Sequence, residues 1–525
     1  KPSDSQTQSQ PEDTKKPEKD DKTDSEQGGS NAGNSNTNKE NENGMNTTIS
    51  LQETSYDYVL ELGKKNAHNL DGFGVQVNVE YFMDYNTKYG VGEADWKLFE
   101  QRVKELKIPK FRVNIMPDYY EPVNDDDNPN NINWEGFAWN SEYMKALYKI
   151  LDVAQENNVK VNITTYGAER DTWLGYPTVE DNAWWLTPPT NLEEYAESTA
   201  AVLKYLIEEK GYTCIDQYTP FNEPDFGFTK GTASGADRVD FDLYVKFCES
   251  IHNRLKKEGI RNKIDFNLAD DATNPTWLKK VTENATLREI ADSFNSHVYK
   301  FDEITSDSSM YTYLSELTGY TNDKPFSILE FGSKHCTDWP ITTQADLDTY
   351  GRGLYYARTA INLLNAGGVG YTHWTLFDYM RTDERMMKIG MYGYYTDNWK
   401  TRPFYHSYSL LSRYCTPNSE VYPAIEKAVK DEYKDLKESG VGGTFLKNSE
   451  GKWTQLLTND NYYTIKVKIV NPQLKNTVMK RYLYSESTLP TDDSVITSSG
   501  EITCKNGELI IAVPARSFIV LTNIS

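Results

Sequence analysis

Short strand-like segments alternate with amphipathic helical segments from about residue 70 to residue 415. Eight such strands, alternating with helical stretches, predict an α/β fold of the (β/α)8 TIM barrel type, in which helices surround a closed barrel of parallel strands. After about residue 416 the pattern changes to strands of period two. This change predicts a C-terminal all-β sandwich domain.

The predicted barrel strands are short apolar runs that alternate with polar residues or end in them. They cover residues 71–77, 111–115, 159–164, 218–223, 264–268, 294–299, 325–330 and 370–374, and the predicted helices cover residues 93–106, 141–157, 192–207, 241–255, 277–290, 343–364 and 403–414. The clearest helix follows Asn191, a favourable N-cap residue, and places Leu192 and Leu203 on one face. An open doubly wound sheet is the alternative, but Gly72-Phe73-Gly74 lacks the GxGxxG spacing of a phosphate-binding loop.

These patterns divide the chain into four regions. Residues 1–46 are almost entirely charged, polar, glycine or proline residues, which predicts a disordered hydrophilic tether. We expect residues 47–69 to add strands to the β-sandwich, residues 70–415 to form the barrel and residues 416–525 to form the sandwich. The tether resembles the linker behind the lipid anchor of a bacterial surface lipoprotein, so we expect a secreted or surface-anchored protein. A dispensable tail is the alternative.

The composition excludes several classes of partner. The net charge of −22 argues against binding to nucleic acid or to an anionic membrane. The sequence has no apolar run long enough to span a membrane. The five cysteines are scattered without metal-binding spacing, which predicts mostly free thiols, at most one disulfide, and neither a metal site nor a cofactor. The acidic stretch 125–128 could hold calcium, but a solvated run of charge is the favoured interpretation.

Polar and aromatic side chains occupy the predicted ends of five strands. These residues are Arg112 in the second strand, Asn222 and Glu223 in the fourth, His297 and Tyr299 in the sixth, Glu330 in the seventh and Trp374 in the eighth. Each of them alone has a plain interpretation as a packed or solvated residue. In a barrel, however, the carboxyl ends of the strands converge at one mouth, where reactive groups lie. Two glutamates there suit acid/base chemistry on an acetal.

Two stretches of the chain resemble the clan A retaining glycoside hydrolases. Asn222-Glu223-Pro224 matches the acid/base glutamate of the clan, which follows an Asn at the end of strand four. Leu329-Glu330-Phe331 matches the nucleophilic glutamate, which closes strand seven. The accompanying Arg, His-x-Tyr and Trp of the clan are matched by Arg112, His297, Tyr299 and Trp374.

Within the clan, two families share features with different parts of this chain. Leu70–Gly74 resembles the start of the barrel in glycoside hydrolase family 30, whereas Asn222–Asp225 and residues 390–414 are similar to family 39. One departure is Thr164–Gly167 at the end of strand three, where the clan often has a His. This departure leaves the subfamily and the substrate open.

The resemblance implies a retaining β-glycosidase that cleaves an extracellular oligo- or polysaccharide through a glycosyl-enzyme. With Arg112 and Tyr299 nearby, Glu330 is expected to stay ionised and to act as the nucleophile. Glu223 is expected to lie in surroundings that stabilise its carboxylate less, so that it can hold a proton near neutral pH and act as acid and then as base. We expect the two carboxyl groups to lie about 5–5.5 Å apart, the spacing of retaining enzymes.

The remaining site residues are expected to bind the sugar. Asn222 would bond its 2-hydroxyl group, His297 would orient Glu223 or a substrate hydroxyl, and Trp374 would form a flat apolar floor. Aromatic residues in the predicted loops after the strands are candidates for stacking on neighbouring sugars. They are Tyr119, Tyr120, Tyr166, Trp173, Trp184, Trp185 and Trp339.

Two other classes of function are alternatives. One is a barrel that binds carbohydrate without cleaving it, which the presence of both glutamates argues against. The other is a structural surface protein in which the β-domain does the binding.

Overall fold

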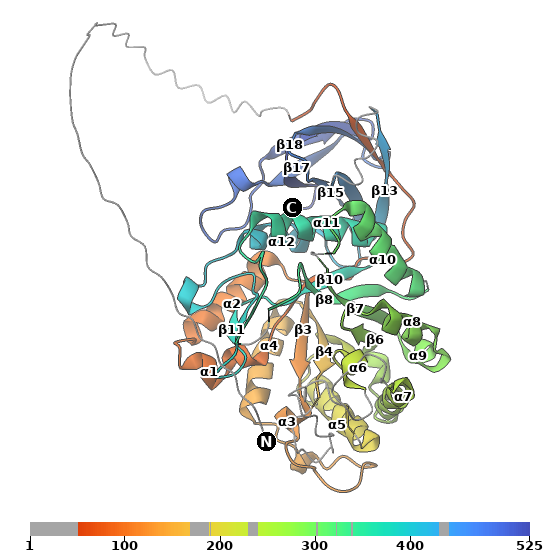
Figure 1. Ribbon diagram of the computed structural model, residues 1–525, viewed down its shortest axis with the longest axis vertical. Coiled ribbons are helices and arrows are strands. Elements are labelled where there is room, and N and C mark those ends of the chain that lie inside the picture. The colour runs from red at the N-terminus through yellow and green to blue at the C-terminus, as the bar shows by residue number, and fades with distance from the viewer. Residues whose placement is uncertain are drawn as a thin grey trace, which may run out of the picture. The chain divides into compact units, whose positions relative to one another are not determined.

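Eight parallel strands close into a barrel, so the predicted fold class is confirmed (Figure 1). The computed structural model describes residues 51–167, 188–189, 191–228, 240–300, 303–321, 323–337, 340–429 and 440–525. In order of hydrogen bonding, the barrel strands are β10 (Gly370–His373), β2 (Gly72–Gln76), β3 (Lys110–Ile115), β4 (Lys160–Thr165), β5 (Ile215–Thr219), β6 (Asp265–Asp271), β7 (Ser293–Tyr299) and β8 (Phe326–Gly332). Strand β8 pairs in turn with β10, which closes the barrel.

Two glycines allow the backbones of β10 and β2 to come close enough to pair. Gly370 and Gly72 are partners in the parallel register, and both have positive φ, +141° and +128°. A Cβ atom at Gly370 would lie 2.0 Å from the carbonyl oxygen of Gly72. Only glycine therefore fits the last seam of the barrel.

Helices surround the barrel strands. They are α1 (Asp84–Thr87), α2 (Glu93–Leu106), α3 (Pro117–Tyr120), α4 (Glu142–Glu156), α5 (Leu192–Lys204), α6 (Pro224–Gly227), α7 (Phe241–Lys257), α8 (Pro275–Glu283), α9 (Ala285–Ile290), α10 (Asp307–Thr321), α11 (Tyr350–Asn365) and α12 (Pro403–Tyr414). Short helical turns cover Val79–Phe82, Trp134–Gly136, Tyr205–Glu209, Arg261–Lys263, Tyr395–Asp397 and Glu486–Thr488.

Two parts of the helical prediction were wrong. The helix expected over residues 343–364 begins only at Tyr350, because Ile341–Thr343 forms strand β9, which pairs with β12 (Met386–Lys388) beside β11 (Tyr379–Met380). Helix α10 was not predicted at all. Its sequence is rich in Ser, Thr and Tyr, and the apolar residues that it buries are only Met310, Leu314 and Leu317.

The remaining long strands form a nine-stranded sheet in the order β18-β17-β20-β15-β14-β13-β1-β16-β19. They are β1 (Tyr58–Leu62), β13 (Glu420–Ala428), β14 (Gly442–Lys447), β15 (Trp453–Asn459), β16 (Ile465–Val470), β17 (Thr477–Tyr484), β18 (Gly500–Cys504), β19 (Glu508–Val513) and β20 (Ser517–Thr522). Strand β13 joins the two halves: residues 420–423 pair with β14, and residues 424–428 pair with β1. Because β13 changes partners along its length, the nine strands can bend around the apolar core of the β-domain.

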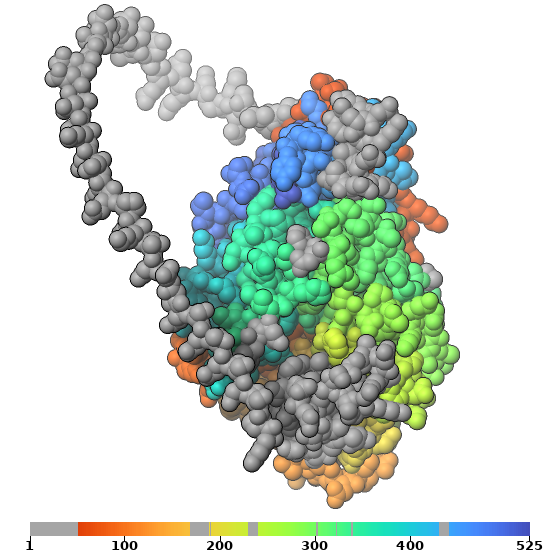
Figure 2. All heavy atoms as spheres, viewed as in Figure 1, coloured from red at the N-terminus to blue at the C-terminus, as the bar shows by residue number. Residues whose placement is uncertain are grey.

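The β-domain packs on the barrel through one face of its sheet. Along β20, Phe518 and Val520 belong to the apolar cluster shared with the barrel, whereas Ile519 and Leu521 belong to the separate core of the β-domain. This division follows from the alternation of side chains along a strand. Figure 2 shows the blue atoms of the β-domain directly against the green atoms of the barrel helices.

Two sequence-based expectations concern the whole chain. All five cysteines are free thiols, so the single disulfide that the sequence allowed does not form. Within the described residues, we find no helix with the length and apolar character that crossing a membrane requires.

Candidate active site

The first of the two glutamates lies four residues beyond β5, which ends at Thr219 and not at Glu223 as predicted. Asn222 N–H donates to Thr165 O at 3.0 Å and Glu223 N–H donates to Asp270 O at 3.0 Å, so hydrogen bonds to β4 and β6 hold this turn at the barrel mouth. Glu223 has a φ of 47°, and Pro224 follows it as the first residue of α6. A left-handed conformation is costly for a glutamate and is often found where a structure positions a functional group.

The second glutamate lies in β8 with both carboxylate oxygens occupied. Arg112 Nη1 donates to Glu330 Oε2 at 2.7 Å, and Tyr299 Oη donates to Glu330 Oε1 at 2.5 Å. The Glu330 side chain is only 7% exposed. A buried carboxylate with a guanidinium and a hydroxyl as donors is fixed in orientation.

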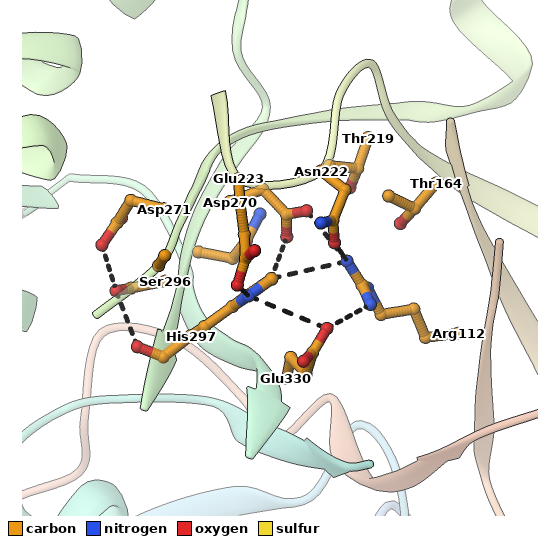
Figure 3. A network of polar contacts seen from close by, with 12 residues as sticks. Arg112, Thr164, Thr219, Asn222, Glu223, Asp270, Asp271, Ser296, His297 and Glu330 are labelled. Atoms are coloured by element: carbon orange, nitrogen blue, oxygen red, sulfur yellow. Dashed lines mark hydrogen bonds and ion pairs between the residues drawn. The ribbon is translucent and has the colours of Figure 1, made fainter. Parts of the chain in front are cut away.

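Arg112 connects the polar groups of the site (Figure 3). Its fully buried guanidinium donates from Nη2 to Asn222 Oδ1 at 2.7 Å and to Asp270 Oδ2 at 2.9 Å, and from Nη1 to Gln76 Oε1 at 2.6 Å. These bonds tie the ends of several barrel strands to one planar cation. Arg112 is therefore a positioning group as well as a source of positive charge.

His297 lies between the acid/base candidate and a buried aspartate. Its Nδ1 is 3.1 Å from Glu223 Oε1, and its Nε2 is 3.0 Å from Asp270 Oδ1. Burial opposes the charged imidazolium, but the carboxylates of Glu330 and Asp270 outweigh it and raise the pKa of His297 well above its usual value. A doubly protonated ring can donate to both neighbours.

Asp270 carries the matching negative charge. Burial favours its neutral form, but Arg112 and His297 prevail and lower the pKa of Asp270 below its usual value. Ala269 and Asp270 have positive φ values, 88° and 47°, at the end of β6. The sequence-based reasoning missed Asp270 because the predicted strand stopped at Leu268, three residues before β6 ends.

The aromatic candidates fall into four groups. Trp374 is half-buried after β10, with its ring edge-to-face against Tyr299 at 6.2 Å between centroids, and so borders the site. Tyr166, 4% exposed, follows β4 and lies under the Arg381 guanidinium at 5.8 Å. Tyr119 and Tyr120 are buried, and Tyr119 stacks on Tyr143, so both belong to the core. Trp173, Trp184, Trp185 and Trp339 lie outside the described residues.

The two glutamates approach each other across the mouth. One carboxylate oxygen of Glu223, one of Glu330 and a ring nitrogen of His297 lie within 4.8 Å of one another. Three such groups could bind a metal, but the buried guanidinium of Arg112, 2.7 Å from Glu330 Oε2, would repel a second cation there. The arrangement suits proton transfer and nucleophilic attack better than metal binding.

The fold and these strand-end groups define a (β/α)8 barrel with a carboxylate pair at its mouth and an attached β-domain. A family 30 endoxylanase from Clostridium papyrosolvens C71 has the same fold, with a TM-score of 0.61 and 13% identity over 89% of this chain and 100% of that chain. A family 39 β-xylosidase from Caulobacter crescentus matches with a TM-score of 0.54 and 12% identity over 88% and 99% of the two chains.

A third similar structure is an endo-β1,6-glucanase, with a TM-score of 0.60 and 13% identity over 90% of this chain and 96% of that chain. No protein-family model and no curated protein matches the sequence. At the level of the fold, these comparisons confirm the resemblance to clan A glycoside hydrolases of families 30 and 39.

Proposed function

We propose that this protein is a retaining β-glycoside hydrolase with Glu330 as the nucleophile and Glu223 as the acid/base. The observation that carries the proposal is the approach of a Glu223 oxygen to within 4.8 Å of a Glu330 oxygen. This approach fits the spacing of about 5–5.5 Å between carboxyl groups in retaining enzymes, whereas inverting enzymes need about 6.5–9.5 Å to admit a water molecule.

The reaction proceeds by two displacements. A Glu330 oxygen attacks the anomeric carbon while Glu223 donates its proton to the glycosidic oxygen, so the C–O bond to the leaving sugar breaks as the bond to Glu330 forms. Glu223, now a carboxylate, then takes a proton from water. That water attacks the anomeric carbon and displaces Glu330, which restores both glutamates and the original anomeric configuration.

The groups around Glu223 suit a residue that gives up a proton and later takes one back. Arg112 and the charged His297 balance the charges of Asp270 and Glu330. His297 Nδ1–H can donate to Oε1 of Glu223, which leaves Oε2 to carry the proton that is transferred. Once Glu223 has lost that proton, the imidazolium stabilises the new carboxylate.

Asn222 and Trp374 suit the binding of the sugar that is cleaved. Arg112 fixes the Asn222 side chain through its oxygen, so the amide N–H2 group can face the substrate and bond its 2-hydroxyl. The Trp374 ring stands beside Tyr299 and offers a flat apolar surface, with a buried indole N–H that has no partner in the described part of the chain. Two proteins of similar fold, an endo-β1,6-glucanase and a β-xylosidase, support a β-linked substrate.

A screen of chromogenic β-glycosides and of plant and host glycans tests the proposal. Wild type should release product from at least one β-linked substrate, and Glu330→Ala should lower the rate by more than about 10³-fold. Glu223→Ala should regain activity when azide is added, because azide can attack the glycosyl-enzyme without a general base. If wild type binds glycans but cleaves none of them, the protein is a non-catalytic carbohydrate-binding barrel instead.

We further propose that the enzyme acts outside the cell, secreted or attached to a bacterial surface. The hydrophilic composition of residues 1–46 supports this location. Fractionation of the native cells with an antibody against the barrel tests it, and recovery only in the cytoplasm would contradict it.

A further inference from the structure

A second group of carboxylates lies away from the catalytic glutamates, where the loop after β3 meets the start of α5. Glu121 follows α3, Asp125 lies four residues later, and Glu197 belongs to α5. One carboxylate oxygen from each of these three residues lies within 4.8 Å of the other two. Figure 1 shows α3 beside α5 near the bottom of the view, and residues of the two helices are in contact.

Glu197 gives an independent indication that this group faces a ligand. Its side chain is 0% exposed, and among the described residues neither of its carboxylate oxygens has a hydrogen-bond partner. A buried carboxylate without any donor is costly, since it loses hydration and gains no compensating bond. Glu194, one turn earlier on α5, is 4% exposed and also has an unpartnered oxygen, Oε2.

The positive charge nearby does not balance these carboxylates. Arg254 of α7 lowers the pKa of both Glu194 and Glu197, but its Nε donates to Glu258 and its Nη1 donates to Pro129 O. Among the described residues, one guanidinium thus stands against four carboxyl groups, three of which have oxygens within 4.8 Å of one another. A bound cation would offset this concentration of buried carboxyl groups.

Backbone N–H groups of the loop after β3 hold two of these carboxylates in place. Asp125 Oδ1 accepts from Asp126 N–H at 2.7 Å, and Asp125 Oδ2 accepts from Asn133 N–H at 2.7 Å. Glu121 Oε1 accepts from Asp125 N–H at 3.1 Å, so both carboxylates are fixed by backbone donors. Asn124, in the same loop, has a buried oxygen without a partner.

We propose that Glu121, Asp125 and Glu197 bind a calcium ion that joins the β3–α4 loop to α5. Ligand oxygens at about 2.3–2.6 Å from a common centre can be up to about 5 Å apart, so the 4.8 Å limit fits one ion. The donor set is entirely oxygen, which suits calcium rather than zinc or another metal that prefers nitrogen and sulfur. Because β3 and α5 flank the barrel mouth, the ion would hold this side of the mouth together.

Thermal unfolding in calcium chloride, magnesium chloride or EGTA tests the site, with Glu197→Gln as the variant. Calcium should raise the Tm of wild type by at least about 2 °C over EGTA. Glu197→Gln should lose this shift, yet in EGTA it should melt at or above wild type, because a neutral amide is buried there at less cost than a carboxylate that must stay charged or take up a proton. Asp127→Asn, which removes one exposed charge from the same loop, should keep the full shift.

Titration calorimetry of wild type with calcium chloride gives a second readout that does not depend on a variant. One calcium per chain should bind, and Glu330→Gln should bind it equally well, because the catalytic site is separate. The assignment is overturned if calcium produces neither heat nor a Tm shift, if magnesium acts as strongly as calcium, or if Glu197→Gln keeps the wild-type shift. In the last case Glu197 is simply protonated.

Discussion

At the scale of single residues, the site depends on a chain of charges in which Arg112 and His297 alternate with Asp270 and Glu330. Arg112 and His297 could be identified from the sequence, since they stand in predicted strands of the barrel. Asp270 could not, because residues 269 and 270 leave the regular strand conformation with positive φ. The residues that complete a site are thus hardest to predict where the backbone departs from regular structure.

Asp270→Asn should lower the pKa of His297, because it removes one of the carboxylates that raise it. Folding raises this pKa, so the stabilising contribution of His297 is full below its ordinary pKa of about 6.5 and is lost as the pH rises through the folded-state value. In the variant this loss should be smaller and should be complete at a lower pH. NMR titration of the His297 ring and urea unfolding at several pH values measure both effects.

Asp265→Asn is the matched control for this experiment, because Asp265 lies at the opposite end of the same strand and is exposed. It should leave the His297 titration unchanged. An unchanged titration in Asp270→Asn itself would show that Asp270 does not set the charge of His297.

Tyr299→Phe should lower kcat/KM by about 10–100-fold, since it removes the hydroxyl that donates to Glu330 Oε1. Its Tm should change little, because the ring and its contact with Trp374 remain. Tyr371→Phe removes a buried hydroxyl that donates to the Tyr356 carbonyl and should leave kcat/KM unchanged. Equal losses in the two variants would mean that the effect is structural.

At the scale of elements, β1 inserts between β13 and β16 and so ties an N-terminal segment into the β-domain. Its pairing with β13 is antiparallel and its pairing with β16 is parallel. The sequence predicted strands within residues 47–69, where β1 lies, whereas α10 gave too weak an apolar stripe to be predicted. Patterns of polarity thus locate elements that bury one clear face, and they fail where Ser, Thr and Tyr share that face.

Leu60→Ala should lower the free energy of unfolding by about 2–5 kcal/mol, because Leu60 of β1 is 2% exposed in the core of the β-domain. Glu61→Ala, at the next and exposed position of β1, should cost little. Urea unfolding compares the two variants. Equal costs would contradict the packing of β1 through Leu60.

At the scale of the whole molecule, the β-domain and the barrel share an apolar cluster that contains Tyr484, Phe518 and Val520 together with residues of α11 and α12. Sequence patterns predicted both parts, but the shared cluster depends on which strand faces meet the helices. That information is absent from local periodicity.

Deletion of residues 417–525 should therefore expose apolar surface on α11 and α12 and give an insoluble barrel. Expression of the barrel with and without these residues, followed by circular dichroism of the soluble fraction, tests this expectation. A soluble, folded barrel would show that the cluster is dispensable.

The central claim is that Glu330 forms a covalent bond to the substrate sugar. Mass spectrometry after incubation with activated 2-deoxy-2-fluoro-β-glycosides tests it most directly, since fluorine at C2 slows hydrolysis of a glycosyl-enzyme. We predict one added sugar on the peptide that contains Glu330 in wild type, and none in Glu330→Gln. A label on another residue, or turnover with inversion at the anomeric carbon and no label, would contradict the account.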